Sequence, residues 1–229
     1  MRKFVASRHG PLRLLLAVLG VVSLGCAKRK VAIEPQPGPM VFSSAAALIK
    51  GLEAAYHERQ LDKFQVLFTN PTLSAAATQP AYRFLLSDPP TGEDVSWGYA
   101  EEMRIQRRMF RPQYLQPGET PVPPEHWLQS VDITLTPTRE FVERPDLYRS
   151  DSNPGGLDPG KWSATEAIYT TYVFFQLAGD TDYRVDGRAN FVVIEDKTKT
   201  NGDPGKWLIY RWEDLGGPTP KPAVTKPAV

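Results

Sequence analysis

The residues that could carry proton transfer are few, and the most conspicuous pair lies near the C-terminus. The segment GKWLIYRWEDLGG (205–217) ends its apolar part with two adjacent acids, Glu213 and Asp214. A buried carboxyl group has a raised pKa and can serve as a general acid or base. Acids at the end of a strand usually face water, so we predict that this pair ends the strand and has no catalytic role.

The other candidates for acid–base chemistry lack partners at a useful spacing. His57 follows Tyr56 in a predicted helix, His126 lies in a loop, and neither has an acid nearby that would form a dyad. Asp186 alternates with apolar residues, so its side chain should point away from the core, whereas Glu166 lies on a strand with mixed faces and can point to either side. Because GxSxG, P-loop and HExxH motifs are also absent from the sequence, we predict no catalytic residue and no cofactor.

Acidic residues also gather in two predicted turns. Asp180 and Asp182 flank one turn, and Asp151 and Asp158 lie in a glycine-rich loop. Neither spacing matches a calcium-binding loop. Aspartate and glycine are the residues that such turns require, so we predict no metal site.

The N-terminus has the pattern of an export signal. Four basic residues precede an uninterrupted apolar run from Leu14 to Leu24: Arg2, Lys3, Arg8 and Arg13. A helix of that length is too short for a bilayer core of about 30 Å, and a basic start before a short apolar run is typical of signal peptides. A buried core helix is the alternative, but basic residues would not be confined to the region ahead of it.

The apolar run ends at Gly25 and Cys26, and Cys26 is the only cysteine, which excludes an intramolecular disulfide. This segment resembles the lipobox of bacterial lipoproteins, although Ser23 stands where that family usually has leucine. The resemblance implies that residues 1–25 are removed and that acyl chains on Cys26 bind the bilayer. Ala27 in place of aspartate implies the periplasmic side of the outer membrane. Each buried CH₂ contributes about 0.8 kcal/mol, so several acyl chains make a lasting anchor.

The remainder divides into a tether at 26–42, one domain at 43–215 and a tail at 216–229. The tether mixes charge, proline and glycine, and the proline-rich tail repeats KPAV, so we expect both to be flexible. Without residues 1–25 the chain has 23 basic and 26 acidic residues, which offers no basic face for a nucleic acid. The composition, 41% hydrophobic and 23% charged, is that of an ordinary globular domain.

The first half of the domain predicts helices. Apolar residues recur at helical spacing behind the N-cap residues Ser43 and Ser44, and a second short helix follows with Asp62 as its cap. A short strand is predicted at 81–86. A third helix is predicted at 98–110, with Met103 and Phe110 facing inward and three arginines facing mostly outward: Arg104, Arg107 and Arg108.

The second half predicts strands. The segments 127–136 and 162–178 lead to a turn at 179–182, and the returning strand shows the clearest alternation in the chain. It places one face inward (Tyr183, Val185, Ala189, Phe191 and Val193) and the other outward (Arg184, Asp186, Arg188 and Asn190). Gly187 predicts a bend or bulge in this strand. In the last strand, alternation places Trp207, Ile209 and Arg211 on one face and Leu208, Tyr210 and Trp212 on the other, so we expect one tryptophan in the core and one on the outer face.

Helices followed by a long antiparallel meander predict an α+β fold with the helices on one face of the sheet. The stretches ALIKGLEAAYHERQLDKFQVLF, VFFQLAGDTDYRVDGRANFVVIED and KWLIYRWEDL resemble the nuclear-transport-factor-2-like cone fold, in particular lipoproteins with that domain. The resemblance implies helices packed in a strongly bent antiparallel sheet, and a homodimer through the outer sheet face. Enzymes of similar fold include isomerases, dehydratases and hydrolases that act with polar residues inside the cone.

Three functions therefore remain open. The first is a non-catalytic envelope lipoprotein that binds a small apolar ligand or a protein partner. The second is an enzyme for a small hydrophobic substrate, and the third is an assembly protein that acts through its sheet face. If the cone is open, we expect five aromatic residues to line its pocket: Tyr56, Phe84, Tyr172, Phe191 and Trp207. A cone packed shut by Tyr56, Phe68 and Trp207 would leave only a partner surface, whereas an open cone with an inward Asp or His beside a tyrosine would contradict a purely non-catalytic function.

Overall fold

The computed structural model describes residues 42–70, 79–86, 95–179, 182–198 and 206–216. The predicted signal peptide, Cys26 and most of the tether and tail lie outside these ranges. Within them, no helix is both long and apolar enough to cross a membrane.

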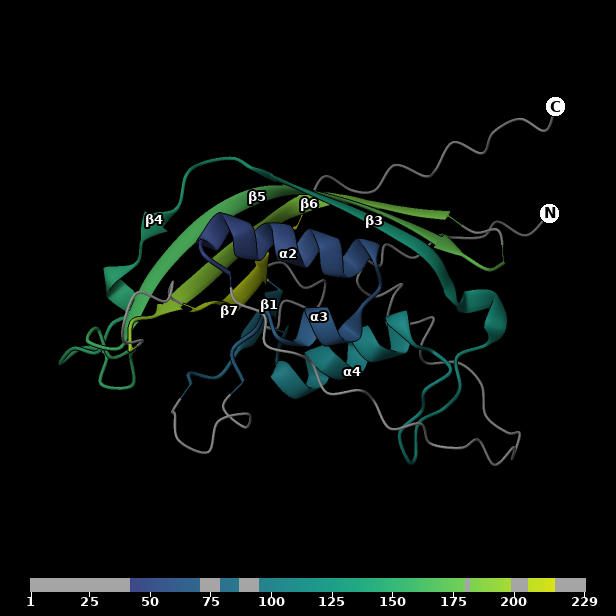
Figure 1. Cartoon of the computed structure of the whole chain (residues 1–229), viewed down its shortest axis with the longest axis horizontal. Coiled ribbons are helices and arrows are strands. Elements are labelled where there is room, and N and C mark those ends of the chain that lie inside the picture. Colours follow the sequence, from purple (N-terminus) through teal and green to yellow (C-terminus); the bar gives the residue numbers. More distant parts are fainter. Residues whose placement is uncertain (1–41, 71–78, 87–94, 180–181, 199–205, 217–229) are drawn as a thin grey trace, which may run out of the picture.

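Three helices lie under an arched sheet (Figure 1). They are α2 (Ala45–His57), α3 (Leu61–Gln65) and α4 (Tyr99–Phe110). The predicted cap of the first helix is confirmed, because Ser44 Oγ accepts a hydrogen bond from the Ala47 N–H at 3.1 Å. Asp62 does not cap the second helix, because α3 begins one residue earlier and Asp62 lies in its first turn.

Seven strands form one sheet, in the order β2-β1-β7-β6-β5-β3 with β4 also paired to β5. Their bounds are β1 (Arg83–Leu86), β2 (Val95–Gly98), β3 (Leu128–Pro137), β4 (Val142–Glu143), β5 (Trp162–Leu177), β6 (Asp182–Asp196) and β7 (Lys206–Asp214). The predicted α+β class with helices in a bent sheet is confirmed. The sheet is mixed, however, because β1 runs parallel to β7.

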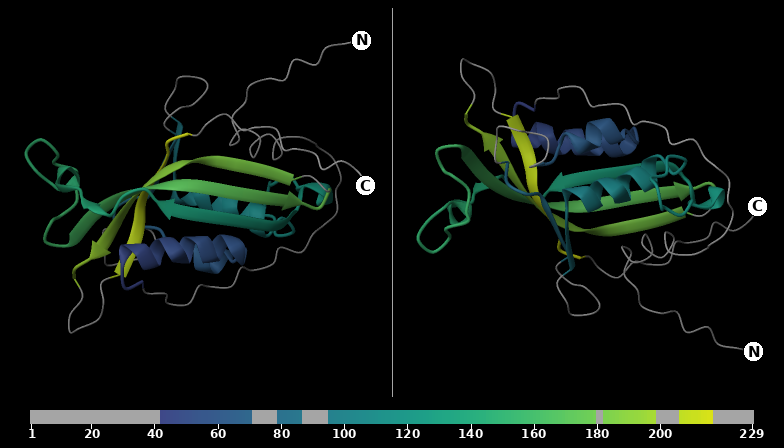
Figure 2. Two further views of the ribbon diagram at one scale, coloured as in Figure 1. Left: turned by 90° about the horizontal axis from the view of Figure 1, so that it is seen from above. Right: turned by 90° about the horizontal axis from the view of Figure 1, so that it is seen from below.

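The main core fills the space between the helices and the concave face of the sheet. Alternate residues of β6 and β5 face it, among them Phe191, Val193 and Tyr169. A second, smaller core lies on the opposite face, where the segment 144–160 folds over the sheet around Leu157, Trp162, Ala164, Ile194 and Leu208. Figure 2 shows α2 lying alongside the long strands rather than across them.

Two predictions for the long strands need correction. The β5–β6 register runs without interruption through Gly187, and the bulge lies instead between β6 and β7, at Val192 and Val193. Because β7 has an extra residue there, its alternation resets. Trp207 and Trp212 therefore both pack against the main core, and the expected division of the two tryptophans between the faces was wrong.

The outward orientation of the arginines of α4 was also only partly right. Arg107 and Arg108 are buried. Arg107 forms a bidentate ion pair with Glu119, a residue of the loop that follows the helix, and also donates to the Tyr114 carbonyl at 2.9 Å. The proline-rich loop therefore folds back over the side of α4 that the helical pattern alone assigns to solvent.

Candidate functional site

The interior of the cone holds a carboxyl group that sequence reasoning missed. Glu102, on the core-facing side of α4, is only 2% exposed. Its Oε2 accepts a hydrogen bond from Trp97 Nε1 at 2.7 Å, and its Oε1 accepts one from Gln106 Nε2 at 3.0 Å. Both donors are neutral, so burial dominates and raises the pKa of Glu102.

Two tyrosines lie beside this carboxyl group. The Gln106 amide that bonds Glu102 also donates to Tyr56 Oη at 2.9 Å, which links α4 to α2. Tyr82, which is 1% exposed, precedes β1 and lies close enough to Glu102 for a charge on that carboxylate to oppose ionisation of the phenol. Burial and the nearby Glu102 raise the pKa of both phenols, so both remain protonated at neutral pH.

Two polar atoms of this interior cluster have no hydrogen-bond partner among the described residues. They are the hydroxyl of Tyr82 and the Oε1 atom of Gln106. Buried polar groups are normally paired with protein or water.

Aromatic rings fill the space around the cluster. Phe84 stacks on Trp97 with ring centroids 4.1 Å apart, and Trp212 contacts Phe84, Phe191 and Tyr56. Tyr56 also meets Phe64 and Phe110 edge to face, and Phe68 meets Tyr82 in the same way. The space around Glu102 is thus a packed aromatic core.

The structure brings together four of the five residues predicted to line a pocket. Tyr56, Phe84 and Phe191 belong to the main core, and Trp207 packs against it. Tyr172 does not join them. It is 36% exposed on the opposite face of the sheet, where the Arg184 guanidinium lies 4.8 Å from its ring centroid.

The titratable residues singled out in the sequence lie elsewhere. The His57 side chain is 73% exposed, with Nδ1 3.8 Å from Asp132 Oδ1, and His126 lies exposed in a short 3₁₀ helix. Glu213 and Asp214 are half-buried rather than turned to water, and burial raises the pKa of Asp214. The prediction was wrong because β1 and β6 pair with β7 on its two sides at these residues, so they do not lie at a free strand end.

Glu166 points to the outer face, away from the main core. Three side chains donate to its carboxylate: Arg139 Nη2 at 2.7 Å, Asn190 Nδ2 at 3.2 Å and Arg144 Nη1. Burial raises the pKa of Glu166, but the bonds from Asn190 and Arg144 outweigh it, so the pKa lies below its usual value. Arg144 also forms a bidentate ion pair with Asp146. Both residues belong to the segment 144–160, so the contact of Arg144 with Glu166 of β5 holds that segment against the sheet.

The acidic turns show no metal geometry in the parts that the structure describes. Asp158 Oδ1 accepts a hydrogen bond from the Gly160 N–H at 2.9 Å, a contact within the turn itself. Asp182 lies exposed at the start of β6, while Asp180 falls outside the described residues. No group of three or more histidine, cysteine or acidic side chains in the described ranges is placed to hold a metal ion.

No protein-family model and no curated protein matches the sequence. Solved structures of similar shape include a conserved protein from Planctomyces limnophilus, with 11% identity and a TM-score of 0.44 over 73% of this chain and 89% of that one. A candidate dehydratase of the nuclear-transport-factor-2-like family from Streptomyces avermitilis has 9% identity and a TM-score of 0.39, over 74% and 90% of the two chains. A protein of the same superfamily from Salmonella enterica has 12% identity and a TM-score of 0.38, over 79% and 92%.

These similarities concern the arrangement of helices and strands. Identities this low transfer no activity, so the function has to be argued from the side chains of this chain.

Proposed function

We propose that this protein is an envelope lipoprotein, anchored through acyl chains on Cys26, whose cone domain binds a protein partner at its surface and catalyses no reaction. The observation that carries the non-catalytic part is the closed interior. Tyr56 and Phe68 are buried in the main core, Trp207 packs against that core, and Glu102 is 2% exposed with both carboxyl oxygens bonded. A general acid must reach its substrate within about 3 Å, and the packed rings around Glu102 leave it none to reach.

The anchor rests on the sequence. A basic start, a short apolar run and a single cysteine directly after it are the features that support lipidation. As a coil, the sixteen residues 27–42 would hold the domain roughly 20–24 Å from the bilayer surface, which suits a partner in the same envelope layer.

The anchor is tested by fractionation of the full chain with and without Cys26→Ala. Wild-type protein should partition with membranes and should carry diacylglycerol and an acylated amine on Cys26 by mass spectrometry. The variant should lose the modification and move to the soluble fraction. A variant that stays with the membranes would overturn the lipid anchor but would leave the closed interior untouched.

The closed interior is tested with an apolar fluorescent dye, 1-anilinonaphthalene-8-sulfonate. Native protein should give no saturable dye fluorescence, while a core variant such as Phe191→Ala, which opens space beside Trp212, should give some. Saturable binding to the wild type would show an accessible apolar cavity and would contradict a purely surface function.

One observation favours a second candidate, an enzyme or small-molecule receptor. The unpaired Tyr82 hydroxyl and Gln106 Oε1 lie beside a carboxyl group of raised pKa, which is an arrangement suited to a small ligand with both a donor and an acceptor. Phenol is a suitable probe for calorimetry. Saturable phenol binding that is lost in Glu102→Gln and Tyr82→Phe would establish this candidate, and absence of binding would reject it.

A further inference from the structure

The helix α4 contributes few apolar side chains to the main core. Every buried residue of α2 belongs to that core, whereas Phe110 is the only buried residue of α4 that does. Tyr99, Met103 and Met109 pack against the core but remain partly exposed. In Figure 1, α4 forms the layer farthest from the arched sheet. Elements that bury few apolar side chains open at a low cost in free energy, so α4 is more easily released than α2.

Two buried polar residues of α4 make its hydrogen bonds to α2 and β2. Glu102 accepts a bond from Trp97 Nε1 of β2 at 2.7 Å, and Gln106 donates to Tyr56 Oη of α2 at 2.9 Å. Gln106 also donates to Glu102 at 3.0 Å, so the two contacts form one chain of hydrogen bonds. A change at Glu102 therefore acts on both neighbours of the helix.

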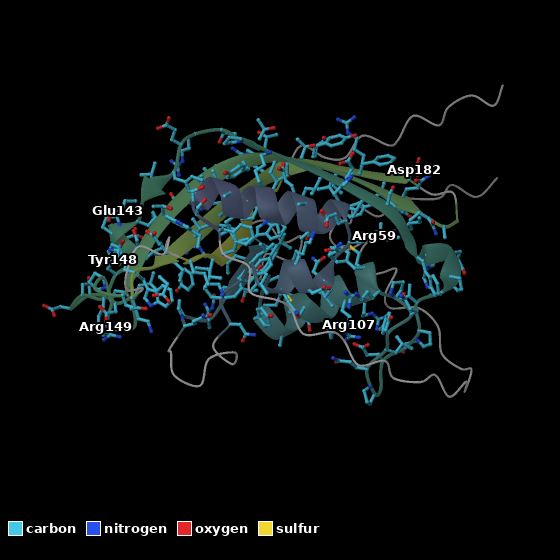
Figure 3. The ribbon with its side chains drawn as sticks, viewed as in Figure 1. Arg59, Arg107, Glu143, Tyr148, Arg149 and Asp182 are labelled. Atoms are coloured by element: carbon cyan, nitrogen blue, oxygen red, sulfur yellow. The ribbon has the colours of Figure 1, made fainter. Side chains whose placement is uncertain are left out.

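The ion pairs of α4 reach other parts of the molecule. Among the described residues, Arg107 pairs with Glu119 in the loop that follows the helix, and Arg111, which ends the helix, pairs with Asp62 of α3. In Figure 3 Arg107 lies beside α4, below the sheet and α2. The polar contact of α4 with α2 and β2 therefore depends on the chain of hydrogen bonds through Glu102.

The ionisable groups that interact with Glu102 include no cation among the described residues. They are the phenol of Tyr56 on α2, the phenol of Tyr82 ahead of β1, and the carboxyl group of Glu101 beside it on α4. β2 contributes a neutral indole. A hydrogen bond from Arg104 lowers the pKa of Glu101, so Glu101 is negatively charged and opposes a second charge at Glu102.

An ionised Glu102 would be a charge without a counter-ion in an aromatic core. Burial therefore raises its pKa, although Gln106, Trp97 and Tyr82 bond the charged form. The first turn of α4 also favours negative charge, but that effect is modest beside burial. Gln106 Oε1 has no partner among the described residues, so the amide has an acceptor to offer when Glu102 carries a proton.

We propose that Glu102 carries a proton while the domain is closed, and that loss of this proton releases α4 and opens the aromatic interior. The O–H bond of the carboxyl group breaks, the proton passes to water, and the carboxylate is solvated once α4 moves away from Trp97 and Tyr56. The proposal rests on the closed interior of the proposed function and adds the condition that keeps it closed. Because the folded pKa is raised, the closed form is favoured at low pH and opening increases as the pH rises through that value.

Release of α4 leaves the rest of the domain in place. α2 and the long strands share the main core through residues such as Leu52, Phe191 and Val193, which do not depend on α4. Phe110 meets Tyr56 and Phe64 edge to face, so its departure exposes both of these rings. An apolar molecule or partner segment would reach the interior only in this state.

Infrared spectroscopy of the full chain in detergent tests the bound proton. At about pH 6 exposed carboxyl groups are ionised, so the C=O stretching band of a protonated carboxyl group comes from buried acids alone. This band should be weaker in Glu102→Gln than in the wild type. Asp214→Asn, which removes another half-buried acid of raised pKa, is the matched control and should retain the contribution of Glu102.

Hydrogen exchange followed by mass spectrometry tests the release of α4. Residues 99–110 are compared between wild type and Glu102→Gln at the same pH, which cancels the intrinsic effect of pH on exchange. The wild-type helix should exchange faster, on the order of tenfold for each pH unit above the folded pKa, while α2 should exchange equally in both proteins. Glu101→Gln, which changes an acid with a 41% exposed side chain, should behave as the wild type.

Dye binding separates this proposal from the closed interior itself. Wild type should bind 1-anilinonaphthalene-8-sulfonate saturably at about pH 9 and not at about pH 6, and Glu102→Gln should bind it at neither pH. Dye binding by Glu102→Gln would contradict the closed interior. Exclusion of the dye by the wild type at both pH values would leave the closed interior intact and overturn the proton switch.

Two further results would overturn the switch. One is an infrared band that Glu102→Gln leaves unchanged, and the other is equal exchange of α4 in wild type and Glu102→Gln at about pH 9. Thermal unfolding at about pH 6 checks that each variant is folded. If Glu102→Gln does not fold, the ratio of α4 exchange to α2 exchange in the wild type decides, because it should increase from about pH 6 to about pH 9.

Discussion

Two carboxylates of this molecule, the buried Glu102 and the partly buried Glu166, have pKa values shifted in opposite directions. Glu102 is 2% exposed and accepts hydrogen bonds from the neutral side chains of Trp97 and Gln106, so burial raises its pKa. The Glu166 side chain is 13% exposed, and bonds from Asn190 and Arg144 overcome the effect of burial and lower its pKa.

The difference shows that burial alone does not determine what an acid does. Glu166 has guanidinium partners and remains charged, so it works as a fastener between the sheet and the segment that covers it. Glu102 has no cation among its partners and is ready to hold a proton inside an aromatic core. If this chain carries out acid–base chemistry, Glu102 is the acid that would do it, and Glu166 is not.

Removing Glu166 should have the largest effect on stability. Glu166→Leu leaves Arg144, Arg139 and Asn190 without their shared acceptor, and losing these partly buried contacts should cost about 2 kcal/mol. The measurement is urea unfolding at neutral pH. Glu143→Leu, at an exposed acid of β4, serves as the control and should change stability by less than about 0.5 kcal/mol. Equal losses in both variants would mean that the ionic group contributes nothing specific.

The pH dependence of stability should separate the two acids next. A raised pKa in the folded state means that stability is fully present below the unfolded pKa near 4.5 and declines as pH rises through the folded value. The stability of Glu102→Gln should therefore increase relative to that of the wild type as the pH increases from about 4.5. The lowered pKa of Glu166 has the opposite sign, so its contribution is present above that pH and declines as pH falls.

Thermal unfolding of wild type, Glu102→Gln and Glu166→Leu between pH 4 and 8 checks this prediction. The stability of Glu102→Gln relative to wild type should rise as the pH increases. The stability that Glu166→Leu loses relative to wild type should become smaller as the pH falls. Parallel curves for the three proteins would show that the two environments do not differ.

The smallest effect should come from one donor of Glu102. Trp97→Phe retains an aromatic ring to stack on Phe84 but removes the indole N–H, at a cost of about 1 kcal/mol. It should also steepen the decline in stability with rising pH, because the charged carboxylate loses a donor. Trp127→Phe removes an indole N–H that bonds the Val122 carbonyl, so it should cost a similar amount without changing the pH dependence. Identical pH profiles for the two variants would contradict the assigned role of Trp97.

The sequence predicted the features that follow a local period. The two faces of β6 alternate as expected because an antiparallel strand between two neighbours keeps a period of two. The first helix and its Ser44 cap were likewise predictable from spacing and side-chain chemistry.

Features that depend on contacts with segments far away in the sequence could not be predicted in this way. The bulge in β7 is set by its match to β6, and it reversed the expected faces of Arg211 and Trp212. Arg107 is buried only because the loop that carries Glu119 returns to it. Glu102 was missed although a signal existed: it and Gln106 fall on the helix face of Tyr99 and Phe110.

The parallel pairing of β1 with β7 has a consequence for the order of events during biogenesis. Arg83 pairs with Arg211, so the first strand of the sheet has to wait for the last one to leave the ribosome. Contacts this far apart in sequence close slowly and late. The sheet therefore cannot be completed until β7 has emerged, however early β1 was made.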